Sequence, residues 1–465
     1  MTKNEEAFLP ACLESVRGLA DEIIVVDTDS SDRTVEIARQ FGAKIHAYRW
    51  NDDFAEARNE SLRHATKDWL LVLDADHTVD PSGHDEIRRI VQRDEFAGYM
   101  LRQFNYTDEH GTESVLEHLN LRLFPNHPAV GYAGRIHEQV ICRNADLSFK
   151  VHACGAILHH HGLRPQVFKQ RGKAERDRRV LLEMAREDPE NAFHAHNLGM
   201  THAALGEYAE AERALRRAIE LSMPQLQGGP YPLYLVSTHL ILARALLAQG
   251  RNAEAVQCCA AAVRLAPNFA DAQLLLGTAE LRLGHLDEAL RSYERARRCS
   301  DGWRFGPSDH SASGWRALLG MGEVYLVQRQ WRQAAAHLEQ AVARSAKARA
   351  LFPALARVCV EIVGAAEAEQ GLGELLDATG AAAARLLLAE VFLADGAAEQ
   401  ALEQLTEALR DDEQNPEILS RMAEAFQRLG CAGEAEAARQ ASQLPRMDRA
   451  TPGPAQPTGR ATPAR

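Results

Sequence analysis

Two aspartates and a histidine that follow an apolar segment form the first group of residues that could do chemistry. The segment is WLLVL, residues 69–73, and Asp74, Asp76 and His77 come directly after it. Asp74 and Asp76 flank one small residue, so in an extended chain their side chains point the same way. Two oxygen ligands at this spacing suit a hard divalent cation, Mg²⁺ or Mn²⁺, which still needs several oxygens from outside the protein. A nucleotide diphosphate can supply them, so these residues predict a metal–diphosphate site.

Another aspartate also ends an apolar segment. Asp27 closes EIIVVD, residues 22–27, as Asp74 closes WLLVLD, residues 69–74. Ligands of open parallel sheets bind beyond the carboxyl ends of the strands, so both carboxylates are expected at one rim of the sheet. The alternative interpretation is that Asp27 and Asp74 cap helices and that Asp76 is a solvated loop residue.

The elements that must position these residues alternate along the first part of the chain. Apolar and β-branched segments predict strands at 22–27, 43–48 and 69–74, and helical patterns predict helices at 4–19, 34–41 and 54–65. Further strands are expected at 99–106, 119–124 and 155–160. This alternation is typical of an α/β fold with a doubly wound, mostly parallel sheet.

From about residue 190 the sequence is rich in alanine and leucine and repeats itself. A glycine precedes a Glu-Ala or Gln-Ala pair in each copy, and 34 residues separate Ala255 from Ala289 and Ala401 from Ala435. A 34-residue period of paired helices is the signature of tetratricopeptide repeats, which stack into an all-α superhelix. Five copies are recognisable, a sixth is expected between 348 and 380, and insertions at 224–232 and 301–314 are expected to be surface loops. An unrelated alanine-rich helical bundle is the alternative.

The composition disfavours some classes of function. The chain has 53 Lys and Arg residues against 65 Asp and Glu residues, and this net charge of −12 disfavours nonspecific binding to nucleic acid or to anionic membranes. No apolar run is long enough to span a bilayer, and no signal peptide is recognisable at the start. The eight scattered cysteines are expected to be reduced thiols, so a cytoplasmic protein is predicted.

Seven segments in order resemble family 2 glycosyltransferases of the GT-A fold. The resemblance is closest to a bacterial subset in which this domain is fused to tetratricopeptide repeats, a subset that includes the S-glycosyltransferases that modify bacteriocin peptides. The segments are KNEEAFLPACLESV (3–16), DEIIVVDTDSSDRT (21–34), WNDDFAEARNESL (50–62), DWLLVLDAD (68–76), RLFPN (122–126), GRIHEQV (134–140) and ILHHHG (157–162).

The resemblance implies roles for the residues of the DxD motif and its surroundings. Asp27 is expected to hydrogen-bond the nucleotide base, and Arg58, in the segment ARN, to help hold the nucleotide. Asp74 is expected near the ribose. Asp76 is expected to coordinate the metal, Mn²⁺ or Mg²⁺. His77 is expected to contact the metal ligands without coordinating the metal itself, or to face solvent.

The resemblance also nominates a catalytic base and a further metal ligand. Glu138 lies in GRIHEQV, where the fold carries its acidic base after a glycine loop. A carboxylate there can accept the proton of a hydroxyl or thiol that attacks the sugar. An ion pair of Glu138 with Arg135 or Arg143 is the alternative. His160 fits the family's His-x-Gly pattern as a metal ligand, although its two neighbouring histidines leave the register open.

The expected domains are a GT-A glycosyltransferase domain at 1–165, a helical linker at 166–190, tetratricopeptide repeats at 191–444 and a disordered tail at 445–465. Family members begin with an apolar strand before the segment KNEE, whereas only Met1 and Thr2 precede Lys3 here. The sheet is therefore expected to lack its first strand.

Together these features predict a metal-dependent, inverting glycosyltransferase. Its donor would be a nucleotide-diphosphate sugar, for which the resemblance favours UDP, and its acceptor a peptide, protein or glycan held by the repeats. A tetratricopeptide scaffold with a catalytically silent sheet domain is the alternative. A nucleotidyltransferase would share the sheet, but it should carry a glycine-rich, basic phosphate loop near the start, and none is recognisable.

Overall fold

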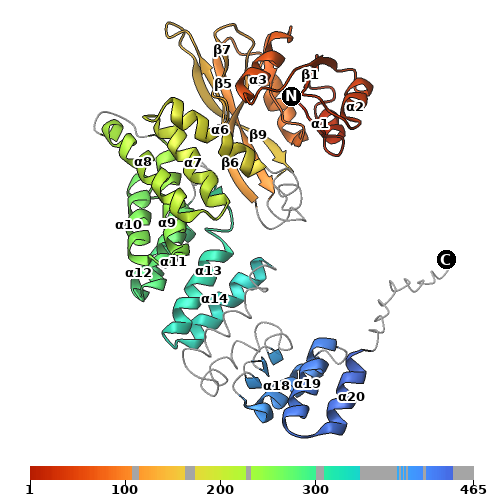
Figure 1. The fold of residues 1–465 in the computed structure, drawn as a ribbon, viewed down its shortest axis with the longest axis vertical. Coiled ribbons are helices and arrows are strands. Elements are labelled where there is room, and N and C mark those ends of the chain that lie inside the picture. The colour runs from red at the N-terminus through yellow and green to blue at the C-terminus, as the bar shows by residue number, and fades with distance from the viewer. Residues whose placement is uncertain are drawn as a thin grey trace, which may run out of the picture. The chain divides into compact units, whose positions relative to one another are not determined.

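The computed structural model describes residues 1–106, 115–162, 173–226, 232–299, 308–345, 396–411 and 415–443, with residues 385–386, 389–390 and 392–393. The chain divides into two compact units, one of residues 1–328 and 336–349 and the other of residues 329–335 and 350–465. The first unit holds the sheets and the first repeats (Figure 1). The described helices of the second unit include α18 (Ala398–Asp411), α19 (Pro416–Arg428) and α20 (Ala432–Ser442).

The first elements follow the predicted alternation of helices and strands. They are α1 (Leu9–Ser15), β1 (Ile24–Asp27), α2 (Thr34–Gln40), β2 (Lys44–Ala47) and α3 (Phe54–Arg63). β1 and β2 pair in parallel, as a crossover through a helix allows. Leu9, Leu13, Val25 and Ile37 form the buried core between these elements.

A second sheet of six strands carries most of the remaining polar residues of interest. Its order is β10-β6-β5-β9-β4, and β3 also pairs with β6. A core that includes Tyr99, Leu101, Leu123 and Leu158 lies between this sheet and α4 (His84–Ile90). The strands are β3 (Trp69–Leu71), β4 (His77–Val79), β5 (Ala97–Tyr106), β6 (Val115–Pro125), β9 (Lys150–His160) and β10 (Ser308–Asp309).

The predicted fold class is confirmed, but the pairing of the strands differs from a mostly parallel sheet. β5 and β9 are parallel, whereas β6 runs antiparallel to β5, β3 and β10, and β4 runs antiparallel to β9. The strand–helix alternation that predicts parallel pairing does not extend beyond α4. Strands β5 and β6 follow each other directly and pair antiparallel, and β7 (Val130–Ala133) and β8 (Gln139–Cys142) form another antiparallel pair.

The residues before Lys3 lie beside β1. The backbone N–H of Thr2 donates to the carbonyl of Val26 at 2.8 Å, and the N–H of Thr28 donates to the carbonyl of Thr2 at 2.9 Å. Thr2 thus forms a parallel bridge with Asp27. Thr2 therefore runs parallel to β1 at this edge, and the absence of the family's first strand stays a prediction.

Paired helices follow α6 (Lys173–Glu187), which falls within the range expected for the linker. The glycines that mark the repeats, Gly206, Gly250, Gly284, Gly396 and Gly430, all have φ between 75° and 79°, which allows a tight turn after a helix. Helices cross closely at Gly277, where an added Cβ would lie 2.8 Å from the ring of Tyr293. The pairs are α7 (Ala192–Ala204) with α8 (Tyr208–Leu226), α9 (Tyr234–Ala248) with α10 (Asn252–Leu265), α11 (Ala270–Arg282) with α12 (Leu286–Arg298), and α13 (Trp315–Val327) with α14 (Trp331–Arg344).

The second insertion is not simply the predicted surface loop. Its residues Ser308 and Asp309 form β10 at the edge of the six-stranded sheet, and Ser308 is buried. Asp271, at the start of α11, accepts hydrogen bonds from the Ser308 hydroxyl at 3.2 Å and the Asp309 N–H at 3.1 Å. These contacts join the repeats to the sheet. Of the other predicted features, residues 227–231 of the first insertion, the sixth repeat copy and the tail at 445–465 lie outside the described residues.

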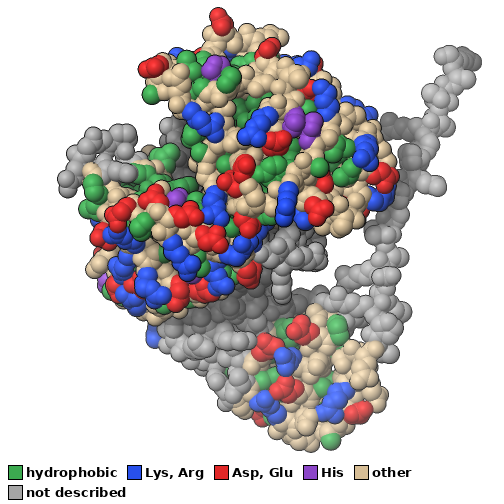
Figure 2. Space-filling model, turned by 45° about the horizontal axis from the view of Figure 1, so that its top comes forward, with side chains coloured by type: hydrophobic (Ala, Val, Ile, Leu, Met, Phe, Trp, Pro, Cys, Tyr) green, Lys and Arg blue, Asp and Glu red, His purple; other side chains and the backbone are tan. Residues whose placement is uncertain are grey.

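Charged side chains on the visible surface are mixed in sign. On the face shown in Figure 2, acidic and basic groups are interspersed rather than gathered by sign. Among the described ion pairs, Arg216 and Arg251 each pair with both Glu212 and Glu254. Within the described part of the chain, no helix combines the length and the apolar character that crossing a bilayer requires.

Candidate active site

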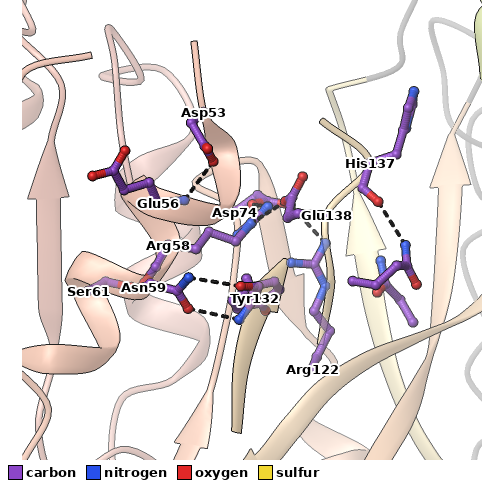
Figure 3. Close-up of polar contacts among 12 residues, drawn as sticks. Asp53, Glu56, Arg58, Asn59, Ser61, Asp74, Arg122, Tyr132, His137 and Glu138 are labelled. Atoms are coloured by element: carbon purple, nitrogen blue, oxygen red, sulfur yellow. Dashed lines mark hydrogen bonds and ion pairs between the residues drawn. The ribbon is translucent and has the colours of Figure 1, made fainter. Parts of the chain in front are cut away.

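Three of the predicted site residues meet in one chain of ion pairs. Arg58, on α3, donates from Nη2 to Asp74 at 2.6 Å and from Nε to Glu138 (Figure 3). Arg122, on β6, donates to the other oxygen of Asp74 at 2.9 Å. The chain Glu138–Arg58–Asp74–Arg122 therefore joins four segments: α3, the turn after β3, β6 and the loop between β7 and β8.

Local structure holds Arg58 where these partners can reach it. Asp53 caps α3 by accepting the N–H of Glu56 at 2.8 Å. Asn59, the next residue after Arg58, exchanges two hydrogen bonds with the backbone of Tyr132, at 2.9 and 2.8 Å. The Arg58 guanidinium lies over the Tyr132 ring, 5.4 Å from its centroid. These contacts fix α3 against β7.

Both arginines act on the ionisation of Asp74. Burial would raise the pKa of this carboxyl, but Arg122 and Arg58 outweigh burial and hold the pKa well below its ordinary value. Asp74 is thus ionised at neutral pH. Arg58 Nη1 and Arg122 Nε are buried and have no hydrogen-bond partner among the described residues, so both can donate to a bound ligand.

Asp74 and Asp76 do not point the same way, contrary to the expectation from an extended chain. Residues 74–77 form a turn in which the N–H of His77 donates to the carbonyl of Asp74 at 3.0 Å. The turn separates the two carboxylates: Asp74 faces the arginines, and Asp76 faces His160, with 3.6 Å between Asp76 Oδ2 and His160 Nε2. Gly162 allows this approach, because a Cβ there would lie 1.9 Å from Asp76 Oδ2.

The register of the three histidines follows from strand pairing. His160 pairs with His77 of β4, and its ring lies edge-on to the ring of His77 at 4.7 Å. His159 points away from Asp76 and contacts Asp80 at 3.0 Å. His161 lies 3.4 Å from the hydroxyl of Thr78. Of the three histidines, His160 is the one that faces Asp76.

Asp76, His77 and His160 form the group of described residues that could hold a metal ion, with one ligand atom from each within 4.8 Å of the others. Burial would raise the pKa of Asp76, but the hydrogen bond and charge of His160 outweigh burial and lower it. Burial lowers the pKa of His77 to about 3, so this imidazole is neutral. An ionised carboxylate with imidazole nitrogens fits a divalent cation.

His77 does not face solvent, which was one of its two predicted positions. Only 1% of its surface is exposed, so it is not solvated. Its Nδ1 accepts the N–H of Asp74 at 3.3 Å, which leaves the hydrogen on Nε2. His77 must therefore give up this long hydrogen bond, or change tautomer, before it can coordinate. Asp76 and His160 fit a metal without such a change.

Asp27 lies at the end of β1 with partners of its own. One carboxylate oxygen accepts the N–H groups of Asp29 and Ser30 at 3.2 and 3.0 Å, and the other accepts the hydroxyl of Thr2 at 3.4 Å. These bonds stabilise the loop after β1 and do not cap a helix, because α2 begins only at Thr34, so the alternative interpretation of Asp27 as a helix cap is wrong. Its contact with a nucleotide base stays a prediction.

The alternative partners weighed for Glu138 are wrong. Arg135 pairs with Glu183 and Glu187 of α6, and Arg143 donates to the carbonyl of Tyr132. The loop around Glu138 packs against α6, because its buried residue Ile136 contacts Val180, Leu181 and Met184 of that helix.

Sequence reasoning missed two residues of the site. Arg122 lies in the segment RLFPN, which resembles the family, but the sequence predicted no role for this arginine. His77 was not expected to reach the metal group. The partners of both residues depend on antiparallel pairing, of β6 with β3 and of β4 with β9, for which the sequence holds no local signal.

Comparison with known proteins adds the family. Residues 1–154 match the model of glycosyl transferase family 2, and residues 194–222 and 241–302 match models of the tetratricopeptide repeat. The chain carries a family 2 glycosyltransferase domain followed by tetratricopeptide repeats. The predicted resemblance is thereby confirmed.

Individual relatives cover parts of the chain. A TPR repeat-containing protein of Synechococcus elongatus is 32% identical over 248 residues, which are 52% of this chain and 60% of the relative. The SPbeta prophage-derived glycosyltransferase SunS of Bacillus subtilis is 29% identical over 190 residues, which are 40% of this chain and 44% of SunS. The chain thus spans 44 to 60% of the length of these relatives. The solved structure of MamA covers 38% of this chain at 20% identity, with a TM-score of 0.32 that carries no functional argument.

Proposed function

We propose that this protein is a metal-dependent, inverting glycosyltransferase. It transfers a sugar from a nucleotide-diphosphate sugar, with UDP as the favoured nucleotide, to a peptide, protein or glycan held by the repeats. The observation that carries the proposal is the ion-pair chain Glu138–Arg58–Asp74–Arg122 beside Asp76 and His160. His77 lies between the ion-pair chain and the pair Asp76–His160. Its Nδ1 is 3.7 Å from the carboxylate oxygen Oδ2 of Asp74, and its ring lies edge-on to the ring of His160.

The charges of the site support a role for a cation in donor binding. Arg58 and Arg122 are balanced by Asp74 and Glu138, and Asp76 adds a negative charge. A diphosphate would be repelled by this arrangement unless a divalent cation were present. When bound, the cation would neutralise charge on the leaving diphosphate. Asp76 and His160 would hold it, and the imidazole ligand favours Mn²⁺ over Mg²⁺, which prefers oxygen ligands.

Arg58 and Asp74 would position the nucleotide, and Arg58 would also position Glu138, the proposed catalytic base. Asp74, held by two arginines, is the proposed contact of the ribose, and Asp27 that of the nucleotide base. Arg58 fixes one oxygen of Glu138 through its Nε. Glu138 would take the proton from the acceptor hydroxyl or thiol while that atom attacks the anomeric carbon and the nucleotide diphosphate leaves.

The acceptor would reach Glu138 along the first two repeats. Three aromatic rings of α7 and α9 lie together there: Phe193, His196 and Tyr234, with centroids 5.2 to 6.2 Å apart. The loop of Glu138 contacts the same region, since Ile136 packs near Leu198 of α7. We also propose a cytoplasmic location, which the seven free cysteines of the described residues support.

The test is release of nucleotide diphosphate from a panel of nucleotide sugars by the full chain, with MnCl₂, with MgCl₂ and with EDTA. The proposal expects release with one donor class, lost in EDTA and restored best by Mn²⁺. Transfer is then sought by mass spectrometry of candidate peptides for an added hexose. A chain that binds peptides but neither binds nor turns over any nucleotide sugar would instead be the scaffold with a silent sheet domain.

A further inference from the structure

Asn105 contacts the ring nitrogen of His160 that faces away from Asp76. Asn105 lies on β5, opposite His160 of β9 and Leu116 of β6, and only 3% of its surface is exposed. Its Oδ1 lies 2.7 Å from His160 Nδ1. This is a short distance, so one of the two atoms must carry a hydrogen that the other accepts.

The backbone decides which atom carries that hydrogen. The side-chain amide of Asn105 also lies 2.8 Å from the carbonyl oxygen of Leu116. A carbonyl only accepts, so the NH₂ group of Asn105 must face Leu116 and its oxygen must face His160. It follows that His160 carries its hydrogen on Nδ1, and that a neutral His160 has its lone pair on Nε2.

This lone pair faces the carboxylate of Asp76. His160 Nε2 and Asp76 Oδ2 are 3.6 Å apart, so a positive charge between them, either a proton on Nε2 or a metal ion, stabilises the pair. We propose that Asn105 is a positioning residue that holds His160 in the Nδ1–H tautomer and so keeps Nε2 available to a divalent cation shared with Asp76. This inference rests on the proposed metal site. Metal-binding histidines generally donate their other N–H to such a partner.

Neighbouring side chains support the same orientation of Asn105. Gln103 donates from Nε2 to Asn105 Oδ1 at 2.9 Å and accepts from Asn120 at 3.2 Å. His118 Nδ1 lies 2.9 Å from the NH₂ group of Asn105, and burial lowers the pKa of His118 to about 4, so this nitrogen can accept. Gln103 Nε2 is 3.3 Å from His160 Nδ1, but both are donors in this arrangement. Gln103 is therefore a matched control.

The first experiment is a Mn²⁺ titration of the full chain, followed by the EPR signal of free Mn²⁺. Asn105→Leu removes the acceptor at similar volume and is expected to weaken Mn²⁺ binding by about 10–100-fold. Asn105→Asp keeps an oxygen that faces His160 and should retain most of the affinity. Gln103→Leu disturbs the same buried network without removing the acceptor and should stay close to wild type. Equal losses in Asn105→Leu and Gln103→Leu would overturn the inference.

The second experiment reads the tautomer directly in the metal-free protein. Histidine ¹⁵N NMR at pH 7.5, with His160→Gln to assign the signals, should show His160 protonated on Nδ1. A bare Nδ1, with the hydrogen on Nε2 alone, would overturn the role of Asn105. Wild-type protein that fails to bind Mn²⁺ would contradict the metal site of the proposed function. Tight Mn²⁺ binding that Asn105→Leu leaves unchanged would contradict only the present inference.

Discussion

The sheet domain and the repeats use charged residues in opposite ways. In the sheet domain, Arg58 and Glu138 are 80 positions apart and both largely buried. In the repeats, pairs such as Arg291–Glu288 join residues one helical turn apart on the surface. Exposed pairs of this kind contribute little to stability, whereas removing one partner of a buried pair leaves an uncompensated charge. The difference indicates that the buried charges of the sheet domain serve a site.

The largest expected effect is the loss of turnover in a variant of Asp76, compared with a variant of the nearby Asp80. Asp76→Asn removes the anionic metal ligand while keeping its shape, so turnover of the nucleotide sugar should fall to that of the EDTA-treated enzyme, and added Mn²⁺ should not restore it. Asp80→Asn is the control, because Asp80 contacts His159 rather than His160. Undiminished turnover in Asp76→Asn would rule out the metal site.

The next effect concerns Glu138. Glu138→Gln can still accept the hydrogen bond of Arg58 but cannot take a proton, so acceptor turnover should fall by about 10²–10⁴-fold. Donor affinity, measured by calorimetry, should change little. Glu187→Gln, on the exposed partner of Arg135, is the control. Donor binding that collapses together with the rate would make Glu138 a structural residue, and a thiol acceptor would reduce the effect.

A pair of leucine substitutions compares α6, which packs against the loop of Glu138, with the repeat helix α8. Leu181 on α6 and Leu215 on α8 are both fully buried, and each Leu→Ala change should cost about 2–5 kcal/mol in the free energy of unfolding. Only Leu181→Ala should lower acceptor turnover per folded molecule, because Leu181 supports Ile136. Denaturant unfolding and assays well below Tm give the two quantities. Equal turnover in both variants would show that α6 does not position the loop.

The smallest effect contrasts two aspartates with opposite pKa shifts. Burial raises the pKa of Asp271 from 3.8 to about 6, so the stability that its protonated form contributes is present below about pH 4 and lost as the pH rises through 6. Asp74, with a lowered pKa, contributes stability that is instead lost as the pH falls.

Asp271→Asn stays neutral at every pH and can still accept from Ser308 and Asp309. Its free energy of unfolding relative to wild type should therefore increase by about 2 kcal/mol between pH 4.5 and pH 7.5. Thermal unfolding at the two pH values measures the change. The exposed control Asp287→Asn should differ from wild type by the same free energy of unfolding at both pH values. A difference for Asp271→Asn that does not change with pH would contradict the raised pKa.

Much of the architecture follows from local patterns. The glycines of the repeats predict the turns between helices because a positive φ is required there, and the described copies follow this pattern. The apolar segments before residue 75 predict β1, β2 and β3 within a few residues. Residues such as Arg58, Asp76, Glu138 and His160 were found through short motifs of the family, while their mutual contacts were not predictable from spacing.

By itself, the sequence determined the family, the repeat period and the chemical types available to the site. Tertiary structure alone decided which of these groups meet. A turn at residues 74–77 directs Asp74 to the arginines and Asp76 to His160, and antiparallel pairing of β4 with β9 selects His160 from three adjacent histidines. The physical reason is that a shift of the strand register by one residue turns every side chain of the strand to the opposite face of the sheet. Register is set by pairing between distant segments, which no local pattern of residues reports.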